Sequence, residues 1–199
     1  LGALGFYMLA VIIGLIIHMS ITYTALLKLY VKMPLKTFFT GIGPAQLLAF
    51  STSSSGATLP VTMERCEDEL GVSEEVSSFV LPLGATINMD GTALYQAVAA
   101  VFISQAIGLD LSLLDQLTIV VTTVLASIGT AAVPGAGIIM LVIILEAIGV
   151  PSSGIALILG VDRILDMLRT VINVSGDATI AITIASSEGQ LKAPKEVAD

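Results

Sequence analysis

The residues most able to do chemistry lie in the last long apolar segment of the chain, residues 152–186. At 100° per residue, six of its polar side chains fall within one helical stripe about 100° wide: Asp162, Asp166, Arg169, Thr170, Asn173 and Asp177. On the surface of a soluble domain, such a stripe would simply be solvated. Its strongly apolar neighbours indicate a membrane helix instead, where a central charge costs about 2.5–3.5 kcal/mol and must face protein, water or ligand.

The composition supports a membrane setting. Of the 199 residues, 55% are hydrophobic and 12% are charged, and the mean hydropathy is +0.98, whereas a soluble domain has about 25% charged residues. These values exclude most soluble enzyme folds. The 8 basic residues against 16 acidic ones also exclude a nucleic-acid-binding surface.

Acidic groups outnumber basic ones at membrane depth. The stripe has three acids, and Arg163 and Arg169 supply two cations, while Asp90 adds a fourth acid in another apolar segment. Pairing of acids with arginines could serve only to hold helices together, but it would leave a surplus of acid. Hard oxygen ligands suit small alkali cations, so the sequence predicts that external cations balance this surplus.

The chain divides into five apolar segments and a tail. We predict a transmembrane helix over 1–30, a re-entrant hairpin over 35–64, a broken transmembrane helix over 76–109, a second re-entrant hairpin over 112–147, a transmembrane helix over 152–186, and a disordered polar tail over 187–199. Lysines at 28, 32 and 36 place the end of the first helix in the cytoplasm. His18, within that helix, is expected to be a packed core residue without a functional role.

The two predicted hairpins have similar tips. Serine, glycine and proline separate two short apolar arms at residues 51–60 and again at 127–137. Helix N-termini near Ser55 and Val133 would point unpaired N–H groups towards the membrane centre, where they attract anions such as carboxylates. Hairpin followed by span occurs twice, on opposite sides, which predicts an inverted-repeat transporter with an all-α membrane fold.

The helix over 76–109 is expected to break at residues 88–92, which read Asn-Met-Asp-Gly-Thr. Unwinding there would free backbone carbonyls, such as those of Gly84 and Thr86, to bind a cation. The alternative is a kinked helix in which Asn88 and Asp90 are hydrogen-bonded to neighbouring groups.

Four motifs in order resemble the dicarboxylate/amino acid:cation symporters, the glutamate/aspartate transporter family. They are the serine motif 53–60, the Asn-Met-Asp-Gly-Thr run with its continuation to residue 95, the second tip 127–137, and the polar stripe 162–177. The resemblance runs to about Gly189 and begins at the family's sixth helix. It therefore implies that the scaffold helices that form a homotrimer lie outside this chain.

The resemblance also implies roles for individual residues. Arg169 would bind the side-chain carboxylate of an acidic amino acid and Asp166 its ammonium group. The other substrate-binding residues would be Ser54, Ser55, Thr92, Val133, Gly137, Thr170 and Asn173. A permanently charged, planar guanidinium favours a carboxylate on chemical grounds as well.

Two or three co-transported sodium ions are implied in the same way. One would bind Gly84, Asn88, Asn173 and Asp177; a second would bind Thr86 and the carbonyls of Ser127, Ile128 and Thr130; a third would involve Asn88 and Asp90. The implied protein is no enzyme. It moves glutamate or aspartate through the plasma (inner) membrane by an elevator motion of this unit, in contact with lipid and with the tail in the cytoplasm.

The chain departs from the family where some members carry an additional arginine. It has Ser53 and Met167 at the two positions concerned. Our hypothesis is that Arg163, one helical turn before Met167, pairs with Asp162 or Asp166 and takes over that role.

Other functions stay open at this stage. A C4-dicarboxylate carrier would also use Arg169, although Asp166 requires an ammonium partner; a neutral amino acid carrier would not require Arg169. A proton-driven carrier would titrate Asp90 or Asp177. An ion channel is the alternative from another class, and it would not need the Asp166/Arg169 pair.

Overall fold

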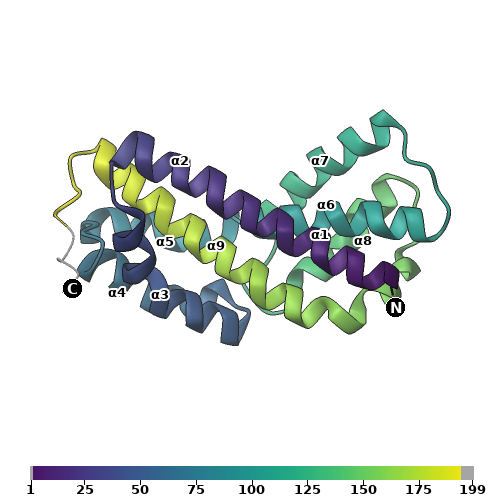
Figure 1. Ribbon diagram of the computed structural model, residues 1–199, viewed down its shortest axis with the longest axis horizontal. Coiled ribbons are helices and arrows are strands. Elements are labelled where there is room, and N and C mark those ends of the chain that lie inside the picture. Colours follow the sequence, from purple (N-terminus) through teal and green to yellow (C-terminus); the bar gives the residue numbers. More distant parts are fainter. Residues whose placement is uncertain (1, 194–199) are drawn as a thin grey trace.

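The computed structural model describes residues 2–193, and within that range helices joined by turns and loops make up the fold, with one isolated β-bridge between Val72 and Leu191 (Figure 1). The predicted all-α fold class is thus confirmed. Residues 194–199 of the predicted disordered tail lie outside the described range, whereas the start of that tail is helical to Ser187 and Gln190 and Lys192 are hydrogen-bonded to the loop before α5.

The elements follow one another in the order of the apolar segments. They are α1 (Gly2–His18), η1 (Met19–Tyr23), α2 (Thr24–Leu26), η2 (Leu27–Val31), α3 (Leu35–Thr52), α4 (Ser55–Asp68), α5 (Glu74–Ile87), α6 (Asp90–Ala106), α7 (Leu113–Ile128), α8 (Ala136–Ala147), η3 (Ser152–Leu157) and α9 (Leu159–Ser187). The elements η1 and η2 are π-helical and η3 is a 3-10 helix.

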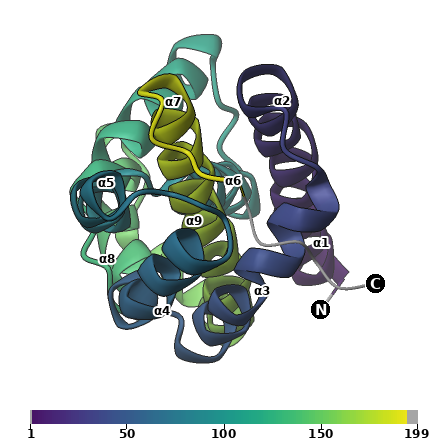
Figure 2. The same cartoon turned by 90° about the vertical axis from the view of Figure 1, so that its left-hand side faces the viewer.

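Helix α9, which carries the polar stripe, is the central element of the fold (Figure 2). It packs against α1, α3, α4, α5 and α6. Because neighbours surround it, the side chains of Asp166, Arg169 and Asp177 are buried against protein, as the cost of an intramembrane charge requires.

Two helical hairpins flank α9. In the first, α3 and α4 are joined at Ser53, which has φ 54°, and the Ser54 hydroxyl caps α4 by accepting from the N–H of Ala57. In the second, α7 and α8 are joined by a longer turn that ends at Gly135, with φ 75°. Both turns need a left-handed residue to reverse the chain within a short distance.

Each hairpin packs into its own hydrophobic core. Residues of the first hairpin, α5 and the C-terminal half of α9 share one core, which includes Phe38, Ile42 and Ile182. Residues of α1, α6, the second hairpin and the N-terminal half of α9 share the other, which includes Tyr95, Leu141 and Leu165. The polar residues of α9 lie where the two cores meet.

The helix over 76–109 is broken at Asn88 and Met89. Their ψ angles of 63° and 55° interrupt the path from α5 to α6. Within residues 2–193, one continuous helical stretch, 2–31, is long and apolar enough by itself to cross a membrane.

The end of the described chain is fastened to the loop before α5. The N–H of Lys192 donates to Gly71 O at 2.8 Å, and the Ser73 hydroxyl donates to Gln190 Oε1. Gly71 has φ 78°, and a Cβ atom there would clash with Lys192 O.

We expect Gly71→Ala to lower the free energy of unfolding by more than the roughly 1–2 kcal/mol that a left-handed alanine costs, because it also expels the segment around Lys192. Gly108→Ala is the matched control, since Gly108 has φ 81° and no atom within 4 Å of the added Cβ. Thermal unfolding of both variants measures the difference. Equal losses would show that the fastening contributes nothing.

Candidate functional site

Asp166 and Arg169 form an ion pair within α9, both almost fully buried. Asp166 Oδ1 accepts from Arg169 Nε at 3.0 Å and from Nη2 at 2.8 Å, and the two residues are 4% and 2% exposed. A buried carboxylate and guanidinium compensate each other's charge. The pair is therefore neutral as a unit, and each member is available to exchange its partner for a ligand of opposite charge.

The tips of both hairpins meet over this pair. The N–H of Gly135 donates to Asp166 Oδ2 at 2.8 Å. Across the tips, Ala132 O accepts from the Ser54 hydroxyl at 2.7 Å and from the N–H of Gly56 at 3.2 Å. These contacts tie the first hairpin, the second hairpin and α9 together at one point.

The space enclosed there is small. A cavity of about 20 Å³ is lined by both tips and by Thr92, Asp166, Arg169, Thr170 and Asn173. This volume is room for about one water molecule, so the structure is a closed form. Admitting an amino acid requires at least one tip to move away.

Arg169 keeps one donor group free in this closed form. Its Nη1 is buried with no hydrogen-bond partner within residues 2–193. The guanidinium lies 4.4 Å from the centre of the Tyr95 ring, a cation–π contact, and a Cβ on Gly137 would clash with it. Glycine at 137 therefore leaves the space that the guanidinium occupies beside the first turn of α8.

Asn173 connects α9 to the start of α6. Its Oδ1 accepts from the N–H groups of Gly91 and Thr92 at 2.9 and 3.3 Å, and its Nδ2 donates to the Thr92 hydroxyl at 2.9 Å. The amide thereby satisfies backbone donors that the helix break leaves unpaired.

Asp177 lies one helical turn beyond Asn173 and is 3% exposed. Its Oδ1 accepts from Asn88 Nδ2 at 3.0 Å, and a Cβ on Gly84 would come within 2.7 Å of the same oxygen. No cationic side chain pairs with Asp177 in the part of the chain that the structure describes. A buried carboxylate with one amide partner is poorly compensated.

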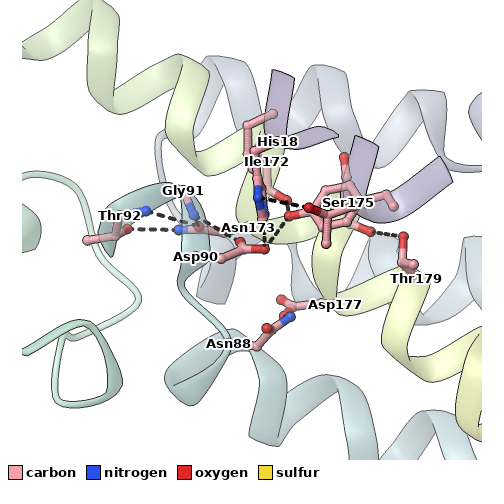
Figure 3. A network of polar contacts seen from close by, with 12 residues as sticks. His18, Asn88, Asp90, Gly91, Thr92, Ile172, Asn173, Ser175, Asp177 and Thr179 are labelled. Atoms are coloured by element: carbon pink, nitrogen blue, oxygen red, sulfur yellow. Dashed lines mark hydrogen bonds and ion pairs between the residues drawn. The ribbon is translucent and has the colours of Figure 1, made fainter. Parts of the chain in front are cut away.

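Asp90 is the second acid at the break, and its surroundings were not foreseen. Its Oδ2 accepts from His18 Nε2 and from the Tyr23 hydroxyl, both at 2.6 Å, and its Oδ1 from the N–H of Gly91 at 2.9 Å. Figure 3 shows His18 of the first helix facing Asp90, with Asn88 and Asp177 close by.

The residues predicted for a second sodium ion lie on α5 and at the C-terminal end of α7. α5 contacts α7, but the Thr86 hydroxyl donates to Leu83 O within its own helix, and that of Thr130 donates to Ala126 O. Ser127 O already accepts from the N–H of Thr130, and Ile128 is exposed.

Among the predicted substrate residues, the structure places most at the closed cavity: Ser55, Thr92, Val133, Gly137, Asp166, Arg169, Thr170 and Asn173. Ser54 lies beside it and holds the tips together. Val133 is 57% exposed, so one side of the second tip faces outward.

The hypothesis for Arg163 is not supported. Arg163 is exposed, and no ion pair joins it to Asp162 or Asp166 within residues 2–193. The reason is competition: Asp166 is held by Arg169 and Gly135, and Asp162 Oδ1 accepts from the Tyr95 hydroxyl at 2.5 Å.

Sequence reasoning also missed Gln96, whose buried amide donates to Gly137 O at 2.9 Å. This bond holds the first turn of α8 against α6, below the guanidinium. Gln96 lies in an apolar segment and belongs to no recognisable motif. The only sequence feature that could have identified it is its position one helical turn after Thr92.

Comparison with known proteins agrees with this geometry. Residues 1–187 match the Sodium:dicarboxylate symporter family. The chain belongs to that family. The chain is 48% identical to "Excitatory amino acid transporter 2" of Mus musculus over 175 residues and 50% identical to "Excitatory amino acid transporter 3" of Mus musculus over 175 residues. It is 49% identical over 176 residues to "Putative sodium-dependent excitatory amino acid transporter glt-3" of Caenorhabditis elegans.

These alignments cover 88% of this chain but 31%, 34% and 33% of the respective relatives. The chain thus spans about a third of the length of the relatives it matches. In this chain, the matched region holds the ion pair, the helix break and both hairpin tips.

For the acidic amino acid carrier that the family resemblance implies, we expect Gly137→Ala to weaken binding of L-aspartate by at least tenfold, because the added methyl group displaces Arg169 from beneath α8. Gly160→Ala serves as the control, since it adds the same methyl group elsewhere in the helical bundle with no atom within 4 Å. Equilibrium binding to both purified variants decides. Unchanged affinity in Gly137→Ala would show that the position of the guanidinium is unimportant.

Proposed function

We propose that this chain is the substrate-carrying part of a sodium-coupled symporter for acidic amino acids, L-glutamate or L-aspartate. The observation that carries the proposal is the buried Asp166–Arg169 pair beneath two closed hairpin tips, with Arg169 Nη1 unpartnered in the described chain. Membership of the family and the names of the relatives support the same function.

The pair fits an amino acid by exchange of partners. An ammonium group that binds Asp166 would replace the guanidinium. The released Arg169 would then bind a carboxylate by donating two parallel N–H hydrogen bonds to its oxygens. A substrate with a second carboxylate brings one net negative charge into a site that is neutral without it. Burying that charge calls for a cation to accompany the substrate.

Asp177 and Asp90 are the groups best suited to hold such cations. Both are carboxylates beside the break between α5 and α6: Asp177 accepts from the Asn88 amide, and the Tyr23 hydroxyl that donates to Asp90 also lies against Ile172 O. Oxygen ligands of this kind suit a small hard cation. Asp177, Asn88, Asn173 and the backbone of Gly84 would hold one sodium ion, and Asn88 and Asp90 would contribute to another. The second site of the prediction, at Thr86, Ser127, Ile128 and Thr130, would form when the second hairpin rearranges.

The exposed surface supports placement in a membrane. Large apolar side chains are exposed on α1, α5 and one face of α7, among them Phe6, Phe79, Leu114 and Leu125. The hairpins would then be re-entrant, the second would be the outer gate, and the unit would move as an elevator against a trimeric scaffold supplied by further sequence. The tail would lie in the cytoplasm.

The rival functions differ in what drives them. Replacing sodium with choline at constant pH abolishes aspartate uptake by a sodium symporter and leaves a proton-driven carrier active. A channel would show flux that does not saturate with amino acid. A C4-dicarboxylate carrier would take up succinate in preference to aspartate.

Arg169→Cys should abolish measurable binding of L-aspartate while leaving the protein folded, because no other described cation reaches the cavity. Arg163→Cys removes the same charge from the exposed side of the same helix and should bind L-aspartate like the parent protein. Binding isotherms and thermal unfolding curves of both variants test this. Undiminished aspartate binding by Arg169→Cys would refute the assignment.

A further inference from the structure

The first helix contains a π-helical turn that places two side chains on one side. In an α-helix, residues five apart point about 140° away from each other. In the π turn of η1, hydrogen bonds join residues five apart, so His18 and Tyr23 lie one above the other. Their rings meet edge to face, with centroids 5.1 Å apart.

Both side chains reach the same oxygen of Asp90. His18 Nε2 and the Tyr23 hydroxyl each lie 2.6 Å from Oδ2, while Oδ1 accepts from the N–H of Gly91. A carboxylate offers about four acceptor positions, and these three donors use three of them. One position on Oδ1 is left for a further ligand.

The two donors are themselves held in place. Thr22 Oγ1 lies 3.2 Å from His18 Nδ1, so a hydrogen bond on the far side of the ring orients Nε2 towards Asp90. The Tyr23 hydroxyl also lies 3.0 Å from Ile172 O, and a Cβ on Gly176 would come within 2.7 Å of it. Glycine at 176 thus gives the tyrosine access to the space between α6 and α9.

We propose that His18 and Tyr23 are positioning residues for sodium. Together they fix the carboxylate of Asp90 in one orientation at the α5–α6 break, so that the remaining position on Oδ1 stays available to the ion. The inference rests on the proposed sodium coupling, and it assigns to the first helix a role in ion binding although that helix lies outside the substrate cavity. Partners that orient a metal ligand typically change metal affinity 10–100-fold when they are removed.

The test uses the full-length protein without substrate and measures the sodium concentration that gives half of the maximal thermal stabilisation. We expect His18→Leu and Tyr23→Phe each to raise that concentration about tenfold. His18→Gln keeps a donor of similar reach and should restore a value close to that of the parent protein. Ser20→Ala, an exposed change in the same π turn, is the control.

A second measurement separates positioning from general damage. At saturating sodium, the affinity for L-aspartate should stay within twofold of the parent protein in all four variants, because the substrate cavity does not include these residues. An unchanged sodium requirement in Tyr23→Phe and His18→Leu, or an equal loss of aspartate affinity, would overturn the inference alone. A parent protein that binds aspartate independently of sodium would overturn the proposed function and this inference with it.

Discussion

The arrangement of the molecule depends on how buried carboxylates are compensated. Arg169 is the only cationic side chain within the described residues that is buried at the site, and Asp166 engages it. Asp177 is left with an amide, and Asp90 with a histidine, a tyrosine and a backbone N–H. Because an isolated buried charge is costly, the proposed function compensates this site with a cation from solution, and the carboxylate of an acidic substrate would increase the need for it.

The fold brings these groups together from distant parts of the sequence. The two hydrophobic cores fix one hairpin to each half of α9, so both tips arrive at the same level as the ion pair. The break at Asn88 and Met89 leaves backbone N–H groups without helical partners at that level. Asn173 Oδ1 accepts from one of them, the N–H of Gly91. Under the proposed function, a change at any of these points would affect both the cavity and the residues proposed to bind sodium, as coupled transport requires.

The main parts of the candidate site were predictable from sequence, because a charged residue in an apolar segment can be buried in only a few ways. The stripe on α9, the helix break and the two serine- and glycine-rich tips each stand out against their neighbours, and each lies at the candidate site. The roles of His18 and Tyr23 were not predictable. In a regular α-helix the two side chains would point in different directions. The π turn that brings them to the same side of the helix is not marked by any motif in the sequence. The pairing of Arg163 failed for a related reason: sequence places it near two acids but does not show that Arg169 and Tyr95 reach them first.

The central claim is that cations from solution compensate the buried acids together with the cargo. The most direct measurement is the affinity for L-aspartate, determined by calorimetry on the full-length protein over a range of sodium concentrations at fixed pH. If two or three ions bind with each substrate, a tenfold reduction in sub-saturating sodium lowers the affinity roughly 100- to 1,000-fold by linkage. An affinity that stays constant across that range would contradict the account.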